Sequence, residues 1–388
     1  MRPALPPLAL YVHMPWCVRK CPYCDFNSHQ LKSAAPDTRY IDALIDDLEA
    51  ELPLIAGRRI ETLFFGGGTP SLFQPSDIGR LLGALRERVE FAPEVEVTLE
   101  ANPGTIERGR FAAYREAGIN RVSLGAQSFS AHALEALGRI HSPDDTYRSV
   151  EELKSAGINN FNLDLMYALP NQTAREAQAD VEAACALNPA HISYYHLTLE
   201  PGTVFHARPP PLPDEDAAWD MQSTGQRILA QAGFEQYEVS AYARGDTRCR
   251  HNLNYWLFGD YVGLGAGAHG KISSGLPEGI LRTVKPRQPR DYQAAVNLAA
   301  GIVGERSAVP VEQLAFEFML NALRLNEGFS TEIFEARTGL SIDAVAQQIS
   351  QAIERGLLEA SGAHSGPGWT PTALGRRFLN DLQTGFLP

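Results

Sequence analysis

The chain has 388 residues, of which 44% are apolar, and a formal net charge of −12 with an isoelectric point near 5.4. This length and apolar content predict a globular protein of about two or three domains with a sizeable core. The acidic balance argues against a broad nucleic-acid surface, which needs a basic face, and no apolar run reaches the ~18 residues of a membrane-spanning helix.

The amino terminus and the cysteines together indicate the cellular compartment. The opening segment MRPALPPLAL lacks the charged-then-apolar plan of a signal peptide. Cys185 and Cys249 are too few and too scattered for a disulfide framework, which suits a reducing compartment. We therefore expect a cytoplasmic protein that is not integral to a membrane.

The first apolar segment, beginning at Leu8, runs directly into a loop that holds three of the five cysteines. These are Cys17, Cys21 and Cys24, in a C-x3-C-x2-C array. Three thiolates on one loop can bind three irons of a 4Fe-4S cluster and leave the fourth iron open. An open iron can take a substrate or cofactor, as the vacant position of a catalytic zinc does.

Zinc is the main alternative for this array. A structural zinc site needs four ligands, so a fourth side chain would have to join the three thiolates. The nearby candidates are His13, His29 and Asp25.

Six apolar, β-branched segments alternate with helical patterns between Leu8 and about Glu200. They are LALYVH, IETLFF, VEVTLE, INRVSL, FNLDLM and HISYYHLTLE. The stretches between them, such as Thr38 to Leu54 and Pro75 to Val89, are long enough for crossover helices and so predict parallel strands. We expect an α/β fold, a partial (β/α)6 TIM-like barrel, whose active site gathers at the carboxyl ends of the strands.

Two of these strand ends carry residues suited to a polar ligand. The three glycines of Gly66 to Pro70 (GGGTP) let the backbone approach a ligand closely, although a tight strand-to-helix turn would also use them. Glu100 ends the third strand, where a carboxylate can accept two hydrogen bonds from a ribose diol. Taken alone, Glu100 is equally a loop acid.

The later strand ends are polar as well. Gln127 follows the fourth strand, Arg139 lies on the next helix or turn, and Asp164 lies on the fifth strand. The sixth segment continues through Thr198. Because buried polar groups need partners, a structural pair of Arg139 with Asp164 is the alternative to ligand binding.

Proline and composition changes indicate three domains. A proline-rich run ending at Pro213 and one further helix close the core, which we expect to span 1–235. The Gly-rich, aromatic stretch 236–305 is a connecting region that contains CRHNLNYW. Residues 306–388 show helices followed by strands, the order of a small winged-helix-like domain.

The carboxyl-terminal domain lacks the positive charge that a DNA-binding domain needs. Its longest helical pattern, SIDAVAQQISQAIERG, has Arg355 alone against Asp343 and Glu354. A recognition helix needs basic residues, so we interpret this domain as a packing or partner domain.

The cysteine spacing, with Tyr23 just before the third cysteine, resembles that of the radical S-adenosylmethionine (SAM) superfamily. The resemblance implies that SAM chelates the open iron through its amino and carboxylate groups and is cleaved to a 5′-deoxyadenosyl radical by an electron from the cluster. The hard chemistry would belong to the cluster and SAM, and the protein would orient them and exclude water.

One branch of the superfamily is especially similar. HNLNYW, together with YVHMPWCVRKCPYCDFNSH, FFGGGTPS, LEANPGT, SLGAQSF and GLGAGAHGK, resembles the radical SAM heme chaperones over nearly the whole chain. These are relatives of oxygen-independent coproporphyrinogen III oxidase. The oxidase has a fourth cysteine where this chain has Phe26, and a longer segment before the first strand, so both differences favour the chaperones.

The oxidase pattern implies which residues bind SAM. Those implied to touch the SAM on the cluster are Tyr11, Tyr23, Gly67 and Glu100. Those that match positions holding a second SAM in the oxidase are Gly68, Thr69, Gln127, Arg139, Asp164 and Thr198. His269 matches a position near the first adenine.

For heme, the resemblance implies His251 of HNLNYW as the axial iron ligand, since a neutral imidazole is a common iron donor. Tyr255 and Trp256 offer flat surfaces to a porphyrin. A lone loop histidine is more often structural, but the full hexapeptide reverses that expectation. Cys249, two residues earlier, is a rival thiolate donor.

The implied function is a heme chaperone that binds a 4Fe-4S cluster, SAM and heme and delivers heme to acceptor proteins such as respiratory enzymes. It would use a reducing electron donor, and no catalytic residue is assigned. Coproporphyrinogen III oxidase proper, which decarboxylates two propionates by radical chemistry, is the alternative. A cluster-bearing RNA modifier is a third class that the acidic charge disfavours. The acceptor and the oligomeric state, a homodimer included, stay open.

Overall fold

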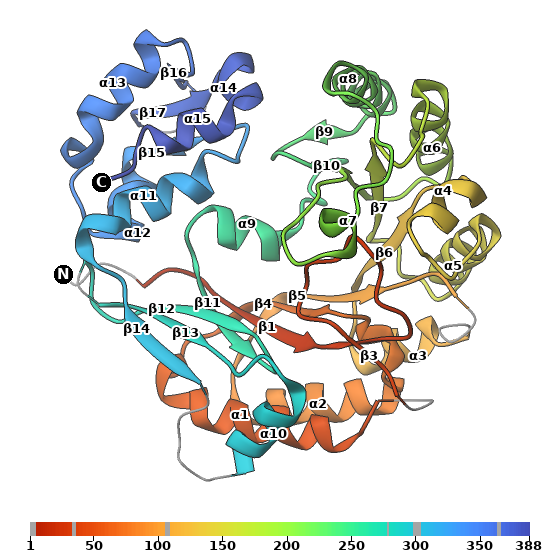
Figure 1. Cartoon of the computed structure of the whole chain (residues 1–388). Coiled ribbons are helices and arrows are strands. Elements are labelled where there is room, and N and C mark those ends of the chain that lie inside the picture. Colours follow the sequence, from red (N-terminus) through yellow and green to blue (C-terminus); the bar gives the residue numbers. More distant parts are fainter. Residues whose placement is uncertain (1–4, 33–35, 105–108, 278, 298–303, 363–365) are drawn as a thin grey trace.

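The computed structural model describes residues 5–32, 36–104, 109–277, 279–297, 304–362 and 366–388. Within these ranges one curved sheet of twelve strands runs through the molecule in the order β14-β13-β12-β11-β1-β4-β5-β6-β7-β8-β10-β9 (Figure 1). Its central strands are β1 (Leu8–Met14), β4 (Ile60–Gly67), β5 (Phe91–Ala101), β6 (Arg121–Gln127), β7 (Phe161–Tyr167) and β8 (His191–His196).

These six strands are parallel and neighbour one another in chain order, so the predicted α/β fold with its (β/α)6 pattern is confirmed. Most of their residues are buried because helices or other chain segments cover both faces of a parallel sheet. The connecting helices are α1 (Arg39–Ile55), α2 (Pro75–Arg88), α3 (Phe111–Ala117), α4 (Ala131–Ala136), α5 (Pro143–Ser155), α6 (Ala174–Ala186), α7 (Val204–Ala207) and α8 (Glu215–Gln231).

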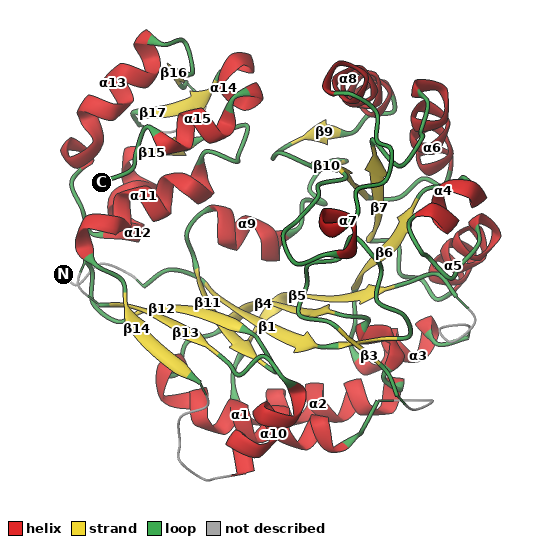
Figure 2. Cartoon of the chain, in the orientation of Figure 1, coloured by secondary structure: helices red, strands yellow, loops and turns green. Residues whose placement is uncertain are grey.

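Helices α1 and α2 lie on the outer face of the sheet with α10 (Pro289–Asn297), and the main core lies between them and the strands (Figure 2). Two of the outer helices begin with a capping box, in which Ser142 pairs with Asp145 and Thr173 with Glu176. These reciprocal bonds satisfy amides that a helix start leaves without partners, and so fix where α5 and α6 begin.

The sheet continues beyond the six predicted strands on both sides. β11 (Asp260–Leu264) pairs in parallel with β1, and three antiparallel strands follow it: β12 (His269–Ser273), β13 (Ile280–Val284) and β14 (Glu305–Ala308). At the other edge β10 (Ala241–Ala243) and β9 (Glu235–Gln236) are antiparallel. The segment predicted to connect two domains therefore covers the open edge of β1, which would otherwise present unpaired backbone groups.

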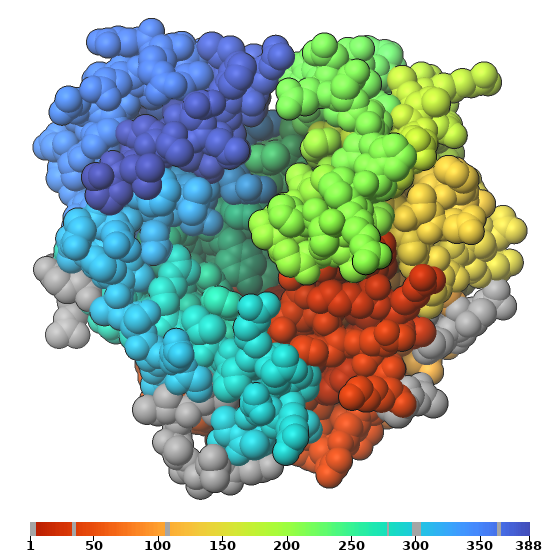
Figure 3. Space-filling model, viewed as in Figure 1, coloured from red at the N-terminus to blue at the C-terminus, as the bar shows by residue number. Residues whose placement is uncertain are grey.

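Helix α9 (Arg250–Trp256), which contains HNLNYW, lies on the inner face of the sheet, opposite α1 and α2, where it packs on β1 and β4 (Figure 1). The space-filling view shows a hollow in the middle of the molecule, between the carboxyl-terminal part and the segment around α7 and α8 (Figure 3). The inner face of the sheet is thus occupied by a helix that the sequence alone did not place there.

The carboxyl-terminal part has its own apolar core, built around Phe318, Phe329 and Phe334. Its elements are α11 (Val311–Ala322), β15 (Phe329–Ser330), α12 (Thr331–Thr338), a 3-10 helix (Ile342–Val345), α13 (Ala346–Glu354), β16 (Leu358–Ala360), β17 (Gly368–Pro371), α14 (Ala373–Arg377) and α15 (Leu379–Thr384). The amide of Asn326 bonds the carbonyl of Tyr237 at 2.9 Å, which ties this part to the sheet edge near β9. Among the described residues, no helix has both the length and the apolar character needed to cross a membrane.

Candidate functional site

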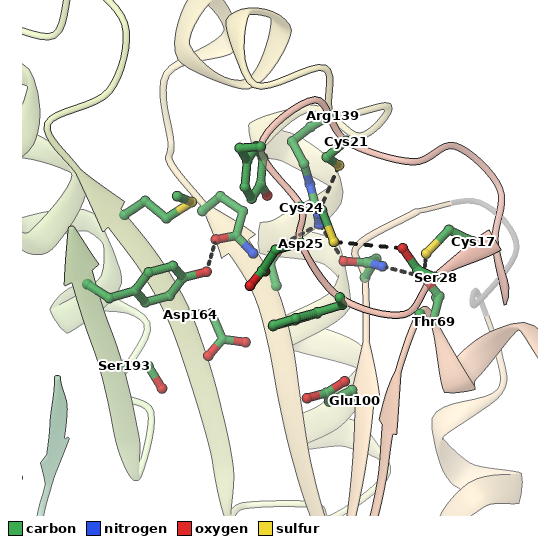
Figure 4. A pocket seen from close by; sticks show the side chains of 18 of the residues that line it. Cys17, Cys21, Cys24, Asp25, Ser28, Thr69, Glu100, Arg139, Asp164 and Ser193 are labelled. Atoms are coloured by element: carbon green, nitrogen blue, oxygen red, sulfur yellow. Dashed lines mark hydrogen bonds between the residues drawn. The ribbon is translucent and has the colours of Figure 1, made fainter. Parts of the chain in front are cut away.

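The three predicted cluster cysteines lie on β2 (Trp16–Cys17) and on the loop that leads to β3 (His29–Gln30), beyond the carboxyl end of β1. Their free thiols border one cavity of about 480 Å³, here named the cysteine cavity (Figure 4). The hydroxyl of Thr69 donates to the sulfur of Cys17 across 3.6 Å, and Arg139 donates to Cys21 across 3.8 Å. A group that follows β4 and a group in the turn after α4 thus hold the loop over the sheet.

These thiols suit a cluster bound by three ligands. Burial raises the pKa of Cys17 to about 11 and also raises the pKa of Cys24, so both stay protonated until a metal displaces their protons. Among the described residues, no three or more His, Cys, Asp and Glu side chains, the three thiols included, converge to hold one metal ion, whereas a cluster gives each thiolate an iron of its own. Three thiols from one loop around a shared cavity fit a cluster that leaves one iron open.

Of the three side chains considered as a fourth zinc ligand, only that of Asp25 borders the cavity of the thiols among the described residues. Asp25 borders the cysteine cavity, whereas His13 and His29 are not among the residues that line it. Both ring nitrogens of His13 have partners, the Tyr11 hydroxyl at 2.9 Å and the Asn27 carbonyl at 2.9 Å. His13 therefore supports the cysteine loop from below instead of joining the thiols.

The glycine turn at the end of β4 packs closely under the cysteine loop. Gly67 has a positive φ of 116°, and a Cβ there would lie 2.6 Å from the ring of His13. A Cβ on Gly68 would lie 2.5 Å from the carbonyl oxygen of Trp16. Both glycines are needed for this approach. The tight-turn interpretation therefore holds, and Gly67, Gly68 and Thr69 also border the cysteine cavity.

Two carboxyl groups, Glu100 and Asp164, face the same cavity from β5 and β7. Glu100 accepts a hydrogen bond of 3.1 Å from the amide of Gly67. Burial, with the charge of Asp164 as a second cause, raises the pKa of Glu100 to about 8. Burial also raises the pKa of Asp164, although Ser123 and Asn162 donate to it at 3.1 and 2.7 Å. At neutral pH Glu100 thus holds a proton that a hydrogen-bond donor could displace.

The predicted alternative of an Arg139–Asp164 pair is wrong. Among the described residues, Arg139 forms no ion pair with Asp164; it donates to the Asn102 side chain and, at 2.9 Å, to the carbonyl of Gly125. The reason is geometric, since Arg139 follows α4 on the side of the cysteine loop. Its guanidinium therefore lies between that loop and the end of β6.

The remaining residues implied for SAM are divided between two cavities. Tyr23, Gln127 and Thr198 border the cysteine cavity. Gln127 has a positive φ of 66° and accepts a 2.7 Å bond from the Tyr195 hydroxyl. Tyr11 and His269 border an adjacent cavity of about 650 Å³, here named the rim cavity, which Gly67 and Glu100 also line.

His251 lies on the inner face of the sheet, close to the residues implied for SAM. Its ring is stacked on Phe64, with 5.0 Å between centroids, and lies 6.4 Å from the ring of Tyr11. Burial lowers the pKa of His251 to about 3, so the imidazole is neutral. His251 also borders an inner cavity together with Tyr11, Glu100 and Asp164, so the proposed heme ligand and residues implied for SAM share one interior.

The rival donor Cys249 immediately precedes α9 and is 1% exposed. Burial raises the pKa of this thiol to about 12, and its sulfur lies 3.8 Å from a carboxylate oxygen of Glu96. Glu96 also accepts from the amides of Arg250 and His251, and so caps the start of α9. Cys249 is therefore part of the helix attachment.

Sequence reasoning missed several residues that line these cavities. Ser123 on β6 and Ser193 and Tyr195 on β8 follow the period-two pattern of a strand face, which could have identified them once the inner face was known. The missed residues are Asn102, Ser123, Met166, Ser193 and Tyr195 in the cysteine cavity, and Asn27, Tyr261 and Arg287 in the rim cavity.

Comparisons with known proteins extend this description. A family model described as the radical SAM superfamily matches residues 11–184, and one described as the HemN C-terminal domain matches 309–378. Proteins named heme chaperone HemW from Escherichia coli and Haemophilus influenzae are each 47% identical to this chain, over 99% of both chains. The mouse protein named radical S-adenosyl methionine domain-containing protein 1, mitochondrial, is 34% identical over 90% of this chain and 81% of its own length.

Among solved structures, the coproporphyrinogen III oxidase HemN from Escherichia coli superposes with a TM-score of 0.82. The match covers 98% of this chain and 90% of that chain at 23% identity. At this level of identity the similarity shows a common fold.

Proposed function

Because the chain belongs to the HemW family of radical SAM proteins, we propose that it is a heme chaperone that binds a 4Fe-4S cluster, SAM and heme and passes heme to acceptor proteins. The observation that carries the proposal is the position of three thiols from one loop around a cavity that Gly67 and Glu100 also line. Cys17, Cys21 and Cys24 would hold the cluster, and the bound cluster would supply an electron to SAM.

The protein groups around the cluster would bind and orient SAM. Gly67 and Glu100 would bind its amino group and ribose, with Tyr11, Tyr23 and His269 beside it. Gly68, Thr69, Gln127, Arg139, Asp164 and Thr198 would line the place of a second SAM. We also propose a reducing electron donor, acceptors among heme-requiring respiratory enzymes, and a cytoplasmic location. A homodimer is the assembly to test.

We retain the division into a radical SAM core (1–235), a connecting region with HNLNYW (236–305) and a winged-helix-like domain (306–388). In this division the heme ligand, His251, belongs to the connecting region. Strands β11 to β13 of this region share the sheet of the core, so movement of α9 relative to β1 and β4 would link heme binding to the SAM-binding part.

We expect SAM to bind more weakly as the pH falls from 8 to 6. Glu100 has a pKa of about 8 in the free protein, and only its ionised form offers all of its acceptor sites to the ribose diol. Below pH 8 binding must expel a proton, which costs up to about tenfold in affinity per pH unit. Calorimetric titration of the cluster-loaded protein at a series of pH values measures this slope.

The variant Glu100→Gln is the control for that pH series. It keeps the side-chain shape but loses the charged acceptor, so SAM affinity at pH 8 should fall about ten- to a hundredfold. The pH slope should also become flatter than in the wild type, whereas titration of SAM itself affects both proteins equally. Equal affinity and equal slopes would identify Glu100 as a loop acid.

We expect no detectable conversion of coproporphyrinogen to protoporphyrinogen by the cluster-loaded protein with SAM and a reductant. The reason lies at Phe26, where the oxidase pattern has a fourth cysteine and this chain has a ring that is 59% exposed and borders both cavities. Chromatography of the porphyrin products, with the oxidase assayed in parallel, tests this. Decarboxylation coupled to SAM consumption would transfer the protein to the oxidase class.

A further inference from the structure

Both ring nitrogens of the proposed heme ligand have partners in this structure. Nδ1 of His251 lies 2.9 Å from the hydroxyl of Thr62, and Nε2 lies 3.0 Å from the hydroxyl of Tyr255. The His251 side chain is also only 1% exposed. A neutral imidazole has one protonated nitrogen and one lone pair, and the lone pair is what an iron needs. One of the two hydroxyls must therefore leave before His251 can bind heme iron.

The surroundings of the two hydroxyls are different. Thr62 lies on β4, is 2% exposed, and so approaches the imidazole from the sheet. Tyr255 borders an inner cavity of about 230 Å³ together with His251, and it also borders the rim cavity of about 650 Å³. Among the described residues, Thr62 borders neither of these cavities nor the cysteine cavity, so a porphyrin would approach His251 from the side of Tyr255.

Tyr255 contacts two other rings among the described residues, and of these only His251 also forms a hydrogen bond with it. It packs edge-on against Tyr261, with 4.6 Å between centroids, and the Tyr261 hydroxyl is itself bound by Arg282 at 2.8 Å. Its other ring contact is His251, at 4.9 Å. The Tyr255 hydroxyl oxygen lies on the axis of its own ring, so it leaves Nε2 only when the whole side chain turns at χ1 toward the cavities that it borders. That turn breaks the hydrogen bond and changes the contact with Tyr261, whereas Thr62 is fixed by the backbone of a central strand.

We propose that Tyr255 guards Nε2 of His251 until heme displaces its hydroxyl, and that Thr62 is a positioning residue that accepts from Nδ1–H and keeps Nε2 directed at the iron. This inference rests on the proposed function, because it assumes that His251 is the axial ligand. A hydrogen-bonded partner on the second nitrogen fixes the tautomer and raises the basicity of a metal-binding histidine.

Removing the Tyr255 hydroxyl should accelerate heme binding. Tyr255→Phe leaves the ring but frees the lone pair, so the association rate of hemin, measured by stopped-flow absorbance, should rise about three- to tenfold. Tyr261→Phe is the matched control, since it removes a hydroxyl at the same cavity that does not touch His251. Its rate should equal that of the wild type.

Removing the positioning residue should have the opposite effect. Thr62→Val should weaken hemin binding about three- to tenfold and shift the reduction potential of the bound heme upward, since a less basic imidazole stabilises ferric iron less. Thr62→Ser should restore both values. In the heme-free proteins, NMR of the histidine ring nitrogens should show Nδ1 protonated in the wild type and in Tyr255→Phe, but not in Thr62→Val.

The results separate this inference from the function on which it rests. If His251→Ala loses the heme spectrum but Tyr255→Phe binds hemin no faster than Tyr261→Phe, Tyr255 does not block Nε2. The assignment of His251 as the heme ligand then still holds. If the Thr62→Val protein keeps the wild-type potential and tautomer, the positioning role of Thr62 is wrong and the assignment of His251 again holds. If His251→Ala binds heme unchanged, the ligand itself is wrong. Thermal unfolding of each heme-free variant verifies that it is folded.

Discussion

Replacing Cys17, Cys21 or Cys24 with alanine is expected to abolish cluster binding, from about four irons per wild-type chain to almost none. Each change removes one of three thiolates from a site in which no neighbouring cysteine can substitute, since Phe26 stands where the oxidase pattern has its fourth. The loop itself should remain folded, because Gly68 and Thr69 bond the backbone of Met14 and Trp16. Iron and sulfide analysis after anaerobic reconstitution measures the loss.

The control for the cluster is Cys185→Ala, on α6, where a half-buried thiol lies away from the cysteine cavity. This variant should keep its full iron content and the broad visible absorbance of the cluster. Iron retained in full by all three loop variants would refute the assignment. Zinc in place of iron in protein purified without oxygen would favour the alternative with Asp25 as the fourth ligand.

Replacing His251 with alanine is expected to remove the shifted Soret band that heme should show with the wild-type protein, and to weaken heme binding by at least about tenfold. The cluster should be unaffected, since His251 lies on α9 and the thiols lie on the loop after β1. Heme titration with parallel iron and sulfide analysis tests both statements. His251→Ala should lose the shifted Soret band in protein without a cluster as well.

Cys249→Ala distinguishes the two candidate heme donors. Because burial raises the pKa of Cys249 to about 12 and Glu96 binds its thiol, we expect the variant to keep the wild-type heme spectrum. A thiolate ligand would give a different spectrum, and its loss would be visible. If His251→Ala retains the wild-type spectrum and affinity, His269 becomes the next candidate.

The sequence by itself determined the repeating part of the fold and the chemistry of the loop. Apolar runs such as LALYVH and IETLFF predicted β1 and β4 because a strand covered on both faces is mostly apolar. The spacing of Cys17, Cys21 and Cys24 needed no tertiary information, since a short loop keeps its own residues together. Glu100 was likewise identifiable, because the end of a parallel strand is where such sheets bind ligands.

Only the tertiary structure decided what meets on the inner face of the sheet. HNLNYW carries no signal that it should pack on β1 and β4, because the contacts of His251 with Thr62 and Phe64 join residues almost 190 positions apart. The hydrogen-bond partner of Arg139 could not be predicted for the same reason. Asn102 and Asp164 are both polar acceptors, and the local sequence does not show which of them the guanidinium reaches. Local sequence preferences determine where helices and strands form. Contacts between residues distant in the chain depend instead on the curvature of the whole sheet and on which of its edges another segment must cover. In this protein β11 pairs with β1, which places α9 over the sheet, so that the ring centroids of His251 and Tyr11 lie 6.4 Å apart.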